Sequence, residues 1–110
     1  MAVWEAFFDD VDALVLPPAM TAAFPHCEPG TDLGVDGQPA RYPGHGRLLG
    51  PATLTGQPAL VVPAGRDAAG LPIGVQLIGP RWSEPTLLAI AQELERIGVL
   101  PGFQPPPAYR

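Results

Sequence analysis

The pattern of apolar and polar positions is clearest in the second half of the chain. Two apolar runs rich in β-branched residues, 59–63 and 72–79, are bracketed by glycine and proline, which is typical of β-strands. The short connection around residues 66–70 leaves no room for a crossover helix and suits a hairpin. We therefore expect these two strands to be neighbours in a sheet and to run antiparallel.

An amphipathic helix is expected to follow the second strand. After Ser83 the apolar side chains recur at helical spacing, at Leu87, Leu88, Ile90, Ala91, Leu94 and Ile97. The Ser83 hydroxyl is expected to cap the helix, Glu84 suits the positive end of the helix dipole, and Gly98 supplies the left-handed residue that commonly ends a helix. Residues 57–98 thus form a predicted strand–strand–helix unit.

The first half begins with two short predicted elements. Residues 2–10 are expected to form a helix that carries three aromatic side chains, and residues 12–16 a buried strand. Pro17 and Pro18 follow that strand directly, and proline cannot donate a hydrogen bond to a sheet. The strand is therefore predicted to end there.

Residues 19–50 form a predicted loop-rich excursion. They contain proline, glycine, histidine and acidic residues without a sustained period, and Asp36 with Gly37 forms the best turn signal. The stretch 44–50 superficially resembles a phosphate-binding loop, but its glycine spacing does not fit and no strand precedes it, so we interpret it as a turn-rich loop. A single helical turn is expected at residues 51–55, where proline at the first position is tolerated.

The predicted elements do not cover one another fully. The runs 12–16 and 59–63 are apolar without alternation, as expected of strands that are covered on both faces by several helices. The sequence offers one strong helix. We therefore expect apolar surface that another chain, or sequence outside these 110 residues, would bury.

Composition supports a loop-rich piece of a larger globular domain. The chain has 110 residues, which suits one modest domain, and 46% of them are hydrophobic. Its 16 prolines and 13 glycines approach the content at which chains tend toward disorder. Apolar strands joined by long connections that wrap around structure supplied from elsewhere reconcile the two signals.

Charge and cysteine content limit which classes of partner and which cellular compartment we expect. The net charge is −5, with no lysine and six scattered arginines, so no basic stripe is available for nucleic acid. The acidic N-terminal stretch does not resemble a signal peptide, and no apolar run approaches the roughly 20 residues of a membrane span. One cysteine allows no internal disulfide. We expect a soluble cytoplasmic protein that binds neither nucleic acid nor membrane.

Few side chains suggest chemistry of their own. His26 and Cys27 invite a thiol–imidazole interpretation, with His45 as another source of imidazole, but adjacent residues rarely converge on one substrate atom. No histidine, cysteine or carboxylate spacing resembles a metal site, and no cofactor motif is found. The acidic residues at 9, 10 and 12 are interpreted as a solvated connection, and Trp82 as a packing residue.

The order of motifs resembles the closing segment of amidase signature enzymes. The segments that carry the resemblance are DALVLPP at 12–18, TGQPALVVPAG at 55–65, GLPIGVQLIGP at 70–80 and TLL at 86–88. The resemblance implies an α/β fold with a mixed sheet between helices, and hydrolysis or transfer at a carboxamide C–N bond. It also implies that residues 1–110 are the C-terminal part of an amidase domain.

The family mechanism depends on a serine nucleophile, a bridging serine and a lysine base, all upstream of the matching segment. This chain has no lysine, and its single serine is Ser83. A hydroxyl is a poor nucleophile without a base. We therefore expect no catalytic residue here and no activity from the chain alone.

The resemblance leaves three functions open. The chain is a C-terminal fragment of an amidase, a noncovalent partner of a separate catalytic-core polypeptide, or a noncatalytic module that self-associates. A small-molecule amide is expected as a ligand only in the context of a complete amidase. Because family loops after the first strand help to shape the substrate pocket, the resemblance indicates Phe24, His26 and Tyr42 as lining residues.

Overall fold

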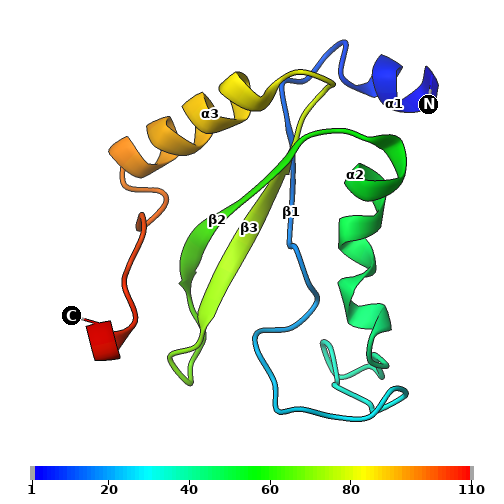
Figure 1. Ribbon diagram of the computed structural model, residues 1–110, viewed down its shortest axis with the longest axis vertical. Coiled ribbons are helices and arrows are strands. Elements are labelled where there is room, and N and C mark those ends of the chain that lie inside the picture. Colours follow the sequence, from blue (N-terminus) through cyan, green and yellow to red (C-terminus); the bar gives the residue numbers. More distant parts are fainter. Residues whose placement is uncertain (1, 110) are drawn as a thin grey trace.

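A computed structural model describes residues 2–109 of the chain (Figure 1). The three strands form one sheet in the order β1-β3-β2, and both pairings are antiparallel. The elements in chain order are α1 (Ala2–Phe7), β1 (Leu14–Leu16), the 3-10 helix η1 (Gly44–Leu49), α2 (Gly50–Thr55), β2 (Ala59–Arg66), β3 (Pro72–Ile78), α3 (Glu84–Arg96) and the 3-10 helix η2 (Pro107–Tyr109). The predicted α/β class and the C-terminal helix are confirmed.

The hairpin of β2 and β3 is the longest paired region. Leu60 lies opposite Leu77, and the register shifts between Pro63 and Gly65. This bulge lets β2 continue to Arg66, beyond the predicted end of the strand, although proline donates no ladder hydrogen bond. The predicted antiparallel hairpin is confirmed.

Two small cores lie on opposite faces of the central strand. Leu77 packs with Leu87 and Ala91 of α3, whereas its neighbour Ile78 packs with Phe8 and Ala52 on the side of α1 and α2. Successive strand residues point to opposite faces, so adjacent residues of β3 serve different cores. In Figure 1, α3 lies on the β2 side of the sheet and α2 on the β1 side.

The edge strands are covered on one face only within residues 2–109. Val15 of β1 is 58% exposed and Val61 of β2 is 50% exposed, while their strand neighbours are partly buried. The sequence offers too few helices to cover both faces of the sheet, and an apolar residue is accordingly exposed on each edge strand. The strand β1 is also shorter than predicted, because it begins at Leu14 and not at residue 12.

The predicted side-chain cap at Ser83 is wrong. Ser83 occupies the N-cap position of α3, but its hydroxyl makes no capping hydrogen bond and is buried without a partner among the described residues. Its φ of −94° and ψ of 16° turn the side chain toward the end of β3, where a Cβ atom added to Gly79 would collide with the Ser83 hydroxyl. The predicted end of the helix is confirmed, since Gly98 has a φ of 81°.

Two further predictions are wrong. The stretch 44–50 is helical, because η1 spans Gly44–Leu49 and α2 continues directly from Gly50. The helix α2 includes the predicted turn at 51–55 and ends at Gly56, whose φ is 69°. Trp82 does not pack in a core, because the residue is 88% exposed, and its φ of 66° is left-handed.

The described chain is less compact than a self-sufficient domain of its size. Its accessible surface is 7616 Å², whereas a folded monomer of the same mass would expose about 5,800 Å². The Cα radius of gyration is 15.7 Å, against about 13 Å for a compact domain of this length. Apolar side chains contribute to this excess at Val3, Leu54, Trp82, Val99 and Phe103. No helix within residues 2–109 is long and apolar enough to cross a membrane.

Candidate functional site

The excursion between β1 and α2 is organised by a small hairpin. Single bridges join Asp32 to Arg41 and Val35 to Gln38, and the backbone groups of Val35 and Gln38 exchange two hydrogen bonds of 2.8 Å. Asp36 and Gly37 between them have φ values of 50° and 76°. Two successive left-handed residues are the signature of a type I′ turn, which confirms the predicted turn.

A carboxylate holds the base of this hairpin. The Asp32 Oδ1 atom accepts hydrogen bonds from the Gly34 amide at 2.9 Å and from the Ala40 amide at 3.0 Å. These two bonds, with a smaller contribution from the Arg41 charge, lower the pKa of Asp32 below its usual value. Local hydrogen bonds thus define the shape of the hairpin although its residues are exposed.

Three rings form an aromatic cluster in the excursion. The ring centroids of Phe24 and Tyr42 are 5.9 Å apart, and His45 lies 4.9 Å from Phe24 and 5.7 Å from Tyr42. The His45 Nδ1 atom is buried and has no hydrogen-bond partner among the described residues. The His45 carbonyl accepts a hydrogen bond from the Met20 amide at 3.1 Å, which connects η1 to the segment after β1.

The three residues indicated by the resemblance surround one depression. Phe24, His26 and Tyr42, together with Pro25 and Cys27, line a cavity of about 240 Å³. The structure therefore brings these residues together, and their contact with a substrate stays a prediction. His45 joins the cluster from η1, which sequence reasoning missed because it assigned that stretch to an irregular loop.

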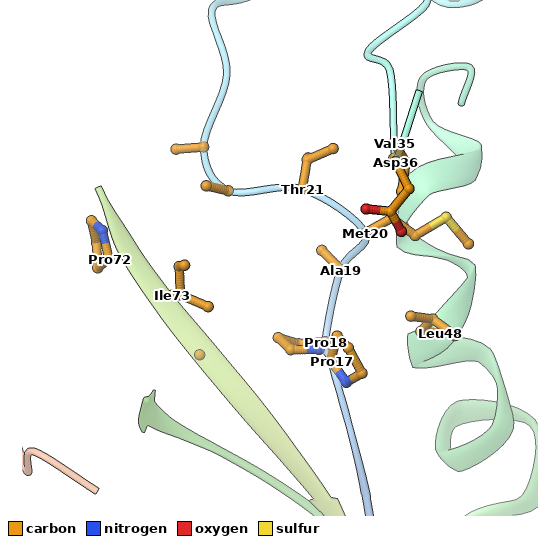
Figure 2. A pocket seen from close by; sticks show the side chains of 13 residues that line it. Pro17, Pro18, Ala19, Met20, Thr21, Val35, Asp36, Leu48, Pro72 and Ile73 are labelled. Atoms are coloured by element: carbon orange, nitrogen blue, oxygen red, sulfur yellow. The ribbon is translucent and has the colours of Figure 1, made fainter. Parts of the chain in front are cut away.

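A larger cavity lies where β1 ends and β3 begins (Figure 2). Its volume is about 520 Å³, and it is lined by residues 17–23, Val35, Asp36, Leu48 and residues 72–74. Gln76 of β3, which is 1% exposed, donates a hydrogen bond from Nε2 to the Leu48 carbonyl at 3.2 Å and so holds η1 against the sheet. Sequence reasoning missed this cavity, because its walls come from four segments that no local pattern connects.

Few of the described side chains are candidates for a catalytic centre. The chain has no lysine, and the hydroxyl of its single serine, Ser83, faces Gly79 beneath α3. In the described part of the chain, no group of three or more histidine, cysteine or carboxylate side chains is arranged to hold a metal ion.

Comparison with known proteins identifies the family of this chain. Residues 1–88 match the Amidase family. The chain belongs to the amidase family. It is 38% identical over 104 residues to a glutamyl-tRNA(Gln) amidotransferase subunit of Methylocella silvestris, covering 94% of this chain and 20% of that protein. It is 39% identical to a fatty acid amide hydrolase of Medicago truncatula, covering 82% of this chain and 15% of that protein.

A solved structure supports the fold of this amidase segment. It is described as "An unexpected vestigial protein complex reveals the evolutionary origins of an s-triazine catabolic enzyme". The two chains are 33% identical with a TM-score of 0.69, and the match covers 87% of this chain and 21% of the other. The amidase segment thus spans about a fifth of the length of its relatives.

Proposed function

We propose that this chain is the C-terminal part of an amidase-type hydrolase that acts on carboxamide C–N bonds. The observation that carries the proposal is the extent of the match, which includes 94% of this chain and only 20% of the amidotransferase relative. In this proposal the Ser-Ser-Lys machinery belongs to polypeptide outside these 110 residues. The chain completes the sheet and contributes a wall of the substrate pocket.

The uncovered surface supports this role. Val15 and Val61 leave opposite faces of the sheet open at its two edges. Burying such apolar positions against further secondary structure is favourable, at about 25 cal/mol per Å² of apolar area removed from water. An amidase core that packs on both sides of the sheet would cover them.

The chemistry of the chain supports inactivity in isolation. Amide hydrolysis by a hydroxyl needs a base that removes its proton and donors that stabilise the oxyanion. Ser83 is 9% exposed and its hydroxyl has no partner among the described residues, so no base activates it. The role that remains for this chain is the shaping of the pocket.

Phe24, His26 and Tyr42 are the wall residues of this proposal. Ligand pockets are commonly lined by aromatic and apolar side chains with a few polar groups that orient the ligand. The cavity of these residues fits that description, with the His26 imidazole as a polar group at its border. A small-molecule amide is the ligand, and the cytoplasm is the proposed compartment.

The proposal is tested by the size and activity of the native protein. An antibody against α3 is used on a lysate of the source organism, and free α3 peptide serves as the competition control. We expect a denatured species several times larger than 11.5 kDa, and amidase activity that follows it through purification. An 11.5 kDa species that hydrolyses carboxamides when purified to homogeneity would overturn the proposal.

A noncovalent partner of a split amidase is the second candidate. It is favoured by the structural relative, which is described as part of a protein complex, and by the open edges of β1 and β2 in the described sheet. This candidate predicts an 11.5 kDa band under denaturing conditions that elutes with a larger amidase-like chain under native conditions. A self-associating module would instead elute as a homodimer without activity.

A further inference from the structure

We propose that the 520 Å³ cavity between the end of β1 and the start of β3 binds an apolar small molecule that carries a protonated amine, whose ammonium pairs with Asp36. The inference deepens the proposed function, on which it rests for the claim that this molecule is the amide substrate. The amine-bearing part of the substrate would lie in this cavity, whose lining residue Ala23 directly precedes Phe24 of the smaller depression. Binding itself is a property of the cavity and does not depend on hydrolysis.

The wall of the cavity is apolar except at two residues, and one of them is charged. Of its 13 lining residues, Asp36 is the charged one, and Thr21 is the other residue with a polar side chain. Figure 2 shows the Asp36 carboxylate directed from the hairpin toward the segment of Met20 and Thr21, with Ile73 on the opposite wall. A carbon chain would lie against Ile73 and the prolines while its cationic end reaches the carboxylate.

The carboxylate of Asp36 lacks the backbone hydrogen bonds that two other loop aspartates accept. Asp32 Oδ1 accepts hydrogen bonds from two backbone amides, and Asp67 Oδ1 accepts two more, from Ala69 at 2.9 Å and Leu71 at 2.8 Å. Both of these carboxylates serve the loop that contains them. The Asp36 carboxylate makes no hydrogen bond or ion pair within residues 2–109, so it keeps its acceptor capacity for a ligand.

The turn does not explain the charge at this position. The φ of 50° favours glycine, asparagine or aspartate, and asparagine would satisfy the backbone equally well. The turn therefore accommodates an aspartate but does not require its negative charge. A carboxylate beside apolar walls attracts cations and repels anions.

The arginines nearby belong to a separate cavity. Arg41 and Arg47 line a neighbouring space of about 380 Å³ that shares Met20 with the first cavity. Their guanidinium groups donate to the Gly30 carbonyl at 3.1 Å and to the Gly44 carbonyl at 3.2 Å, so both are held on the other side of that wall. The cavity of Asp36 thus keeps its negative character, and hexanoate serves as the anionic counter-probe.

Binding is tested by nuclear magnetic resonance titration of the intact native protein, labelled with ¹⁵N in this 110-residue segment. The probes are n-hexylammonium, 1-hexanol and hexanoate, which share a six-carbon chain and differ in charge. We expect n-hexylammonium to shift the amides of residues 19–23, Asp36 and 73–74. It should bind about fivefold more tightly than 1-hexanol, the upper range for an ion pair with an exposed carboxylate such as Asp36. Added salt should reduce that preference.

Two variants attribute the preference to the carboxylate. Asp36→Asn and Asp36→Gly both tolerate the left-handed turn, and either should abolish the preference for n-hexylammonium while leaving 1-hexanol binding unchanged. Retention of the two backbone hydrogen bonds between Val35 and Gln38 verifies that the hairpin is intact. Asp10→Asn, an exposed position beyond α1, changes net charge equally and should leave every affinity unchanged.

A second readout uses the intact amidase that contains this segment. The ratio of kcat/KM for 6-aminohexanamide to that for hexanamide should fall about fivefold in Asp36→Asn. Equal binding of n-hexylammonium and 1-hexanol, or a preference that survives both Asp36 variants, overturns the inference and indicates that the cavity is filled by protein. An intact protein that hydrolyses neither amide overturns the proposed function instead, and the titration still decides the ligand.

Discussion

Two regions of the molecule are stabilised by different interactions. They are the strand–strand–helix unit of β2, β3 and α3, and the excursion of residues 19–50. Residues 76–79 of the unit are buried without interruption, and Leu77, Ile78 and Leu87 are at most 2% exposed. No residue between 19 and 50 is buried, and local hydrogen bonds define that region instead. The cavities of about 520 Å³ and 380 Å³ adjoin the excursion. A packed scaffold thus carries a loop region that lines surface cavities, and binding loops are commonly supported in this way.

The largest effect should come from removing a core side chain of the unit. Leu87→Ala should lower the free energy of unfolding by about 3 kcal/mol, because the side chain is deeply buried against Leu77 and Ala91. Leu88→Ala on the same helix, where the side chain is 53% exposed, is the matched control and should cost far less. Urea unfolding followed by circular dichroism measures both, and equal losses would contradict the assigned packing.

A pair of glycine substitutions compares the two regions directly. Gly79→Ala should lower the free energy of unfolding by about 2 kcal/mol, because the new Cβ would press on Ser83 and Leu87. Gly46→Ala in the excursion should be neutral or slightly stabilising, since its new Cβ meets no atom within 4 Å and its φ is not left-handed. Thermal unfolding of both variants provides the comparison. A larger loss for Gly46→Ala would refute the contrast.

Ser83→Ala tests whether the Ser83 hydroxyl caps α3. A capping hydroxyl and a buried, unsatisfied one predict opposite changes in the free energy of unfolding. A working N-cap serine stabilises a helix by about 1 kcal/mol. Here the hydroxyl is buried and unsatisfied within residues 2–109, so its removal should raise the free energy of unfolding by about 1 kcal/mol. A lower melting temperature in Ser83→Ala would show that the hydroxyl does cap α3 in solution.

The smallest expected effect is the pH dependence of the excursion hairpin. Backbone hydrogen bonds hold the pKa of Asp32 below the unfolded value, which is about 3.9 for an aspartate. The contribution of this carboxylate is therefore complete above the unfolded pKa and is lost as the pH falls through the folded pKa. The Gly34 and Ala40 amide resonances should shift together below about pH 4, and Asp32→Asn should remove that titration. Residues of α3 report no such transition if the hairpin responds alone.

Local patterns predicted the elements of the unit well. The period of the apolar residues identified α3, and the apolar runs between glycine and proline identified the two hairpin strands, although β2 continues past Pro63 to Arg66. The turn at Asp36 and Gly37 was also predicted, because it needs two residues that tolerate a positive φ. These features depend on residues close together in the chain, so the sequence contains the information that specifies them.

The failures have a common physical cause. Ser83 has the side chain of a cap, yet packing beneath α3 turned its hydroxyl toward Gly79. The glycine-rich stretch that begins at Gly44 became helical, and Gln76, far along the chain, donates to the Leu48 carbonyl within it. A contact from a distant segment decides such positions, and no local propensity reveals it.

The sequence by itself determined the family, the strand–strand–helix unit, the turn of the excursion hairpin and the absence of a lysine base. Tertiary structure alone decided which segments meet. It placed Phe24, His26 and Tyr42 around one depression, and it brought Asp36 to a cavity whose other walls begin at Pro17 and Pro72. Side-chain spacing along a chain specifies local conformation, whereas a cavity exists only where segments separated in sequence leave space between packed surfaces.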